Sequence, residues 1–134
     1  MMVRIASLLG LCVLCLLAAL PAQAQQQKVI ADGKDEFQHN CVACHGDAGK
    51  GDGRLAELLT VKPADLTQIA KKNGGTFPFW QAYGIIEGKV PVKGHAYMPD
   101  WESRFKADEP KPGYAYAYLR ILTLTHYLES IQEK

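Results

Sequence analysis

Apolar residues dominate the first two dozen positions of the chain, and a mixed polar and apolar pattern follows them. Arg4 precedes a run that is almost wholly apolar up to Leu20, and the small-residue pattern A-Q-A ends at Ala24. A basic start, an apolar middle and an A-x-A site are the layout of a secretory signal peptide. The run is also somewhat short for the ~20 residues of a membrane-spanning helix. We therefore expect a signal peptide over residues 1–24, whose removal leaves one domain over residues 25–134.

The pattern after the signal predicts a first helix that leads into a pair of cysteines. Asp32 stands where a helix N-cap is expected, and acidic residues follow it in the first turn, where the helix dipole favours them. Phe37 precedes Cys41 by four residues, so both lie on one face of this helix. Gly46 follows His45 and suits a helix end.

The middle of the chain predicts shorter helices. Residues 54–59 favour a single helical turn, and Pro63 suits the first position of a helix that runs towards Lys72. Asn73-Gly74-Gly75 ends that helix. A stripe of large apolar residues at helical spacing then predicts a further helix; its members are Phe79, Trp80, Tyr83 and Ile86.

The C-terminal segment predicts the longest helix, from about Tyr114 to Gln132. Its apolar positions follow the i, i+3, i+7, i+10 spacing of one helix face, namely Ile121, Leu124, Leu128 and Ile131. The expected fold is therefore all-α, with about four helices. Long loops over 46–62 and 87–113 are expected to connect them without regular structure.

Charge excludes some classes of partner. The chain has 15 Lys and Arg against 14 Asp and Glu, and loss of Arg4 with the signal would leave the remainder near neutral. No basic excess is present to bind nucleic acid or anionic lipid. After the signal, no stretch is long and apolar enough to insert stably in a membrane, so we expect a small exported protein.

The stretch "CVACH" carries the strongest chemical signal. Export permits a disulfide, but a bond between Cys41 and Cys44 would close a very small loop and stabilise little. A redox dithiol usually accompanies a strand–helix–strand pattern, and a closed zinc site needs four ligands, of which Cys41, Cys44 and His45 supply only three. C-x-x-C-H is also the attachment signature of c-type haem. The pattern favours haem, with the other interpretations still open.

The spacing of this motif has a mechanical reason. Residues three apart share a helix face, so two thiols can each form a thioether to one side of the porphyrin while His45 reaches the iron. A second axial ligand could come from Met98, which stands in "GHAYMPDW". Pro99 biases Met98 towards extended conformations and so helps to aim its thioether. His95 is the competing candidate.

With these motifs in order, "CVACH", "YMPDW" and a terminal "HYLESI", the chain resembles a small single-haem cytochrome c of the bacterial periplasm, with His/Met ligation. The resemblance covers nearly all of residues 28–133. It implies one covalent haem c per chain and the cytochrome c-like fold, in which the last helix crosses the first near Phe37. We expect Tyr127 and Leu128 at that crossing, and His126 to serve packing rather than ligation.

The implied function is one-electron transfer between periplasmic redox proteins such as a dehydrogenase, a reductase or a terminal oxidase. The chain is then expected to be a monomer or weakly associated, and not itself an enzyme. Alternatives are a haem-bearing subunit of a larger periplasmic oxidoreductase, and an open-site haem protein with peroxidase-like or gas-binding activity. The resemblance also makes the Pro63 carbonyl a candidate partner of the His45 ring. The sequence leaves open whether Trp101, Arg54 or Arg104 approaches the haem.

Overall fold

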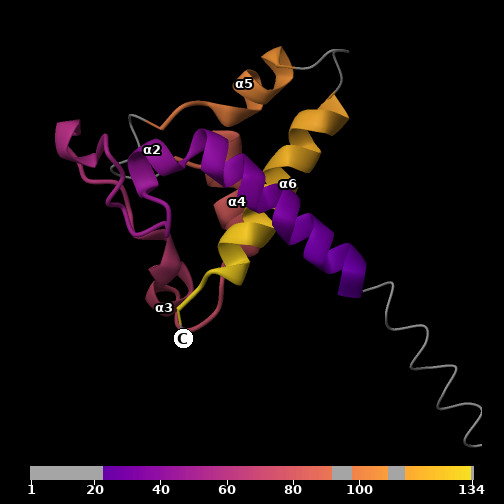
Figure 1. Ribbon diagram of the computed structural model, residues 1–134, viewed down its shortest axis with the longest axis horizontal. Helices are drawn as coiled ribbons and strands as arrows, with labels where there is room; N and C mark the ends of the chain where they lie inside the picture. The colour runs from indigo at the N-terminus through magenta and orange to yellow at the C-terminus, as the bar shows by residue number, and fades with distance from the viewer. Residues whose placement is uncertain (1–22, 92–97, 109–113, 134) are drawn as a thin grey trace, which may run out of the picture.

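The computed structural model describes residues 23–91, 98–108 and 114–133, and these contain helices and no strand. The all-α prediction is therefore confirmed (Figure 1). In chain order the helices are a helix over 23–40, α2 (Val42–His45), the 3₁₀ turns Ala56–Leu58 and Leu66–Gln68, α3 (Ile69–Lys72), α4 (Phe79–Glu87), α5 (Trp101–Ala107) and α6 (Tyr114–Ser130). None of these described helices is long and apolar enough to cross a membrane.

The 23–40 helix crosses α6, as Figure 1 shows, and the crossing is where the resemblance placed it. The rings of Phe37 and Tyr127 lie 5.3 Å apart, centroid to centroid, and Phe37 is fully buried. Gly33 lets the two backbones approach, because a Cβ at this position would lie 2.5 Å from the carbonyl carbon of Thr123. The prediction that Asp32 caps this helix is wrong. The helix is already formed at residue 23, and Asp32 pairs with Lys28 one turn earlier, at 2.7 Å.

The hydrophobic core joins the first helix to α4, α5 and α6. Its larger members are Phe37, Tyr83, Ile86, Trp101, Phe105, Ile121, Leu124, Tyr127 and Leu128. The predicted face of α6 supplies Ile121, Leu124 and Leu128. Of the stripe predicted for α4, only Tyr83 and Ile86 are buried, whereas Trp80 is 66 % exposed. Met98, Cys41 and Leu66 pack against this core while only partly buried, so the core is continuous with the site described below.

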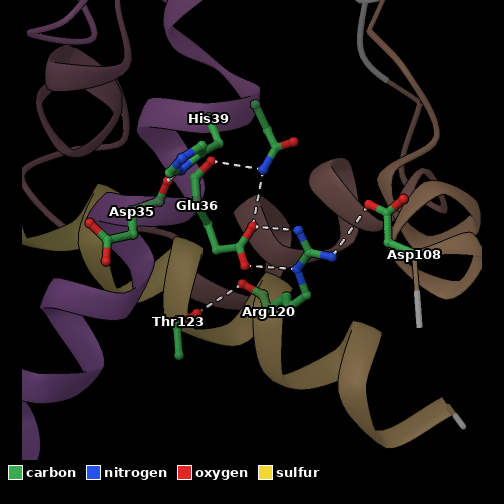
Figure 2. Close-up of polar contacts among 7 residues, drawn as sticks. Asp35, Glu36, His39, Asp108, Arg120 and Thr123 are labelled. Atoms are coloured by element: carbon green, nitrogen blue, oxygen red, sulfur yellow. Dashed lines mark hydrogen bonds and ion pairs between the residues drawn. The ribbon is translucent and has the colours of Figure 1, made fainter. Parts of the chain in front are cut away.

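A partly buried ion pair fixes the 23–40 helix to α6 on the side next to α5 (Figure 2). Arg120 donates from Nε and Nη2 to the two carboxylate oxygens of Glu36, at 2.7 and 2.8 Å. The same guanidinium lies 3.8 Å from the ring centroid of Phe105 and 3.6 Å from a carboxylate oxygen of Asp108. Asn40 donates to Glu36 from the other side, at 3.0 Å. The helix that leads into the cysteines is thus held to α6 by polar as well as apolar contacts.

The predicted helix ends agree with the structure better than some predicted starts. Gly46 ends α2 with φ of 78°, and Asn73 ends α3. Pro63, however, lies outside any helix; the helical segment begins at Leu66, with Asp65 as N-cap accepting from the Thr67 backbone N–H at 2.9 Å.

The expectation of a structureless loop over 87–113 is also wrong, because it contains α5. Asp100 caps α5 by accepting hydrogen bonds from the backbone N–H and the hydroxyl of Ser103. Trp101 and Phe105 anchor α5 in the core. The resulting fold packs α4, α5 and α6 against the helix that leads into the cysteines.

Candidate cofactor site

One cavity gathers the residues that the sequence singled out. It has a volume of about 590 Å³, within the ~300–1,000 Å³ range of cofactor pockets. Cys41, Cys44, His45 and Met98 all line it. Its walls are largely apolar and come from several helices and loops, including Leu55, Leu59, Val61, Leu66, Ile69, Ala82, Ile85, Ile86, Leu124 and Leu128.

Helix α2 places the two cysteines and His45 on a single turn. The backbone N–H groups of Cys44 and His45 both donate to the Cys41 carbonyl, at 3.1 and 2.9 Å. Both cysteines are free thiols. Burial, with smaller contributions from nearby Glu36 and Cys44, raises the pKa of the Cys41 thiol to about 12. Because thiol–disulfide exchange requires a thiolate, this environment argues against a redox dithiol.

The ring of His45 has a defined orientation. Its Nδ1 lies 3.0 Å from the Ala64 carbonyl oxygen. A carbonyl can only accept, so Nδ1 carries the proton and donates it, which puts the lone pair of the neutral ring on Nε2. The candidate acceptor named from the sequence, the Pro63 carbonyl, is one residue off. Ala64 directly precedes the N-cap Asp65, whose backbone is extended.

The glycine-rich loop after His45 packs tightly under α2. The Gly51 backbone N–H donates to the His45 carbonyl at 2.8 Å, and Gly51 has φ of 78°. A Cβ at Gly53 would lie 2.5–2.6 Å from the backbone of Val42 to Cys44. Close backbone packing against the cysteine turn therefore requires glycine at position 53.

Met98 approaches the cavity from a different part of the chain. It lies three residues before α5, is half-buried, and lines the cavity together with Pro99 and Trp101. The structure thus brings Met98 and His45, more than fifty residues apart in sequence, to the walls of one space. His95, the competing ligand, lies outside the described residues.

Basic residues stand at the cavity too. Arg104 lines it and lies 5.4 Å from the Trp101 ring centroid. Arg54, by contrast, lines a separate hollow on the other side of the cysteine turn. Lys62 and Lys72 also line the cavity, and the sequence reading missed both because no motif marks them.

The donor set fits a covalently held haem. Two thiols on one helix turn, an imidazole whose Nδ1 lies against a backbone carbonyl, and a thioether share a mostly apolar space large enough for a cofactor. Among the described residues there is no cluster of three or more His, Cys, Asp or Glu side chains that could hold a metal ion by itself. These residues therefore suit the iron of a haem better than a metal ion that protein side chains alone would have to bind.

Comparison with known families agrees with this chemistry. The family described as cytochrome c oxidase, cbb3-type, subunit III, matches residues 28–116, which is more than half of the chain. No curated protein and no solved structure gives a significant match. The chain belongs to this family of c-type cytochromes, which bind c-type haem and transfer electrons.

Proposed function

We propose that this protein is a one-electron carrier whose single haem c is tethered by Cys41 and Cys44 and ligated by His45 and Met98. The observation that supports this best is the shared cavity, which all four residues line. A c-type haem, when bound, exchanges one electron at its iron. With both axial positions taken by the chain, no site is left for oxygen or a substrate, which favours a carrier over an enzyme.

The surrounding residues tune this site. The Ala64 carbonyl fixes the ring of His45 and increases the basicity of its ligating nitrogen. A thioether ligand raises the reduction potential, and the apolar walls have the same effect because they disfavour the extra charge of the oxidised iron. The covalent tether keeps the cofactor attached outside the cytoplasm.

Transient partners are expected at the open side of the cavity. Leu55 and Val61 line the cavity and are 38 % and 45 % exposed, and Leu58 between them is 78 % exposed. Such a small apolar rim suits the brief encounters of redox proteins, which bury little surface. We further propose export with cleavage after Ala24, a mature domain over residues 25–134 and a periplasmic location, based on the signal-like N-terminal pattern.

The visible spectrum of the oxidised protein tests the ligand set. We expect low-spin iron with the weak band towards the red end of the spectrum that is attributed to sulfur ligation. Met98→Leu keeps apolar volume but removes the sulfur, so it should abolish this band, lower the reduction potential and admit cyanide. The matched control His95→Gln should leave the spectrum unchanged. High-spin wild-type iron that binds carbon monoxide readily would instead indicate an open-site haem protein.

A second candidate function is that of a haem-bearing subunit in a larger oxidoreductase. The family description names an oxidase subunit, and several large apolar side chains of α4 and α6 are exposed. On α4, Ala82 and Ile86 face the cavity, whereas Trp80 is 66 % exposed; Leu119 and Tyr118 on α6 are also exposed. The Trp80 ring contacts Tyr83, whose ring contacts Tyr118, so the two exposed rings belong to one aromatic cluster of the kind that often marks interfaces.

Native mass measurement separates these two candidates. A free carrier should have the mass of a single chain when it is purified from the membrane and periplasmic fractions of the cells that produce it. A subunit should be recovered in a larger haem-containing complex, and Trp80→Lys should release it without changing the visible spectrum. A monomeric wild-type protein from every fraction would exclude the subunit hypothesis.

A further inference from the structure

The C-terminal end of the chain is tied to the segment just before α3. Figure 1 shows the C-terminus beside α3. The Gln132 side chain accepts a hydrogen bond from the Ala70 backbone N–H at 2.8 Å and donates to the Leu66 carbonyl, also at 2.8 Å. The backbone N–H of Glu133 donates to the Thr67 carbonyl at 2.9 Å. One amide side chain thus bridges both ends of a five-residue stretch.

This stretch begins two residues after Ala64, the residue that holds the His45 ring. Leu66 is only two residues from Ala64, whose carbonyl oxygen lies 3.0 Å from His45 Nδ1. The Leu66 backbone N–H also donates to the Gly49 carbonyl at 2.7 Å, within the loop that follows α2. The position of the Ala64 carbonyl is therefore set from both sides, by the glycine loop and by the C-terminus.

We propose that Gln132 is a positioning residue for the His45 ring, acting through the segment that carries the Ala64 carbonyl. The inference rests on the proposed role of His45 as an iron ligand. The residue type matters, because the bridge needs one acceptor and one donor on the same side chain, which an amide supplies and a carboxylate does not. Gln132 also donates to the Leu128 carbonyl at 2.6 Å, which anchors its head group on the last turn of α6.

The adjacent Glu133 contributes less to this arrangement. Its carboxylate contacts Lys50 at 3.2 Å and the Gln68 amide at 2.6 Å. These groups are about half exposed, and exposed ion pairs contribute little. The Gln132 amide is part-buried, and its partners are backbone groups, which cannot turn towards other partners without moving the chain.

Loosening this bridge has a specific consequence for the haem ligand. A backbone carbonyl held against Nδ1–H orients the imidazole and increases electron donation from Nε2. If the carbonyl moves away, the ring becomes a weaker donor and the oxidised iron is stabilised less. The reduction potential then rises, and the Nδ1 proton exchanges faster with solvent.

The test compares two variants of the full holoprotein. Gln132→Met removes the bridge and keeps a side chain of similar length. Ser130→Ala is the matched control, because the Ser130 hydroxyl donates only within α6, to the Tyr127 carbonyl at 2.7 Å. We expect Gln132→Met to raise the reduction potential and to speed exchange of the His45 Nδ1 proton roughly tenfold, the factor that loss of about one hydrogen bond implies. Ser130→Ala should change neither quantity.

Further measurements keep the outcomes distinct. Gln132→Glu retains an acceptor for Ala70 but loses the donors, so it should raise the potential in the same direction. If Gln132→Met and Gln132→Glu both keep the wild-type reduction potential and the wild-type exchange rate of the His45 Nδ1 proton, the inference is overturned. A lower resistance to guanidinium in these variants would then show that Gln132 has only a structural role. Absence in the wild type of any iron-shifted His45 proton would instead contradict the ligand assignment itself.

Discussion

Gly33 offers a sharp test of the crossing between the 23–40 helix and α6. Helix propensity alone predicts that Gly33→Ala stabilises the protein by ~1 kcal/mol. The structure predicts the opposite sign. The new Cβ would lie 2.5 Å from the Thr123 carbonyl carbon and 2.9 Å from Tyr127 Cβ. Overpacking typically costs ~1–3 kcal/mol, and a backbone obstacle cannot rotate away, so we expect the upper end of that range. The net effect is a loss of about 2 kcal/mol.

Gly84→Ala is the matched control within α4. Its added Cβ would meet only a methyl group of Val90, at 2.7 Å, and a side chain can shift where a backbone cannot. The gain in helix propensity should then nearly cancel the packing cost, leaving stability within ~1 kcal/mol of wild type. Guanidinium unfolding of the holoproteins measures both changes. A Gly33→Ala protein as stable as wild type would refute the close helix crossing.

Two further predictions concern charges. The side chains of Glu36 and Arg120 are only 20 % and 16 % exposed, so a double-mutant cycle on this pair should give a coupling energy above ~1 kcal/mol. The exposed pair Lys28–Asp32 should give no more than ~0.5 kcal/mol. Equal coupling energies for the two pairs would contradict the role assigned to burial. Arg104→Leu removes a positive charge at the cavity and should lower the reduction potential by a few tens of millivolts. This is the effect expected of a partly screened charge whose interaction with the iron is worth ~1 kcal/mol or less. An unchanged potential in voltammetry would show that Arg104 is too far from the iron to affect it electrostatically.

Local patterns in the sequence were enough to predict much of the fold. The ends at Gly46 and Asn73 and the long α6 depend on the conformational preference of a few residues and on one apolar face. Helix α5 was missed although its signal is local. Asp100 followed three residues later by Ser103 is a capping pattern, but the whole of 87–113 was expected to be loop.

The sequence predicted the candidate ligands of the site, but not the backbone group that orients the His45 ring. Cys41, Cys44 and His45 form one contiguous motif, and Met98 stands out as the lone methionine after the signal. The Ala64 carbonyl, by contrast, differs from the Pro63 carbonyl only in the path of a loop. That path depends on a contact with Gln132 nearly seventy residues away, which no local pattern contains.

The tether between the cofactor and the two thiols is the central claim, and the intact mass of the denatured, exported protein tests it most directly. We predict a mass equal to that of residues 25–134 plus one haem. The added haem mass should be absent when Cys41 and Cys44 are both changed to Ala. A wild-type polypeptide that carries no added mass after denaturation would contradict covalent attachment.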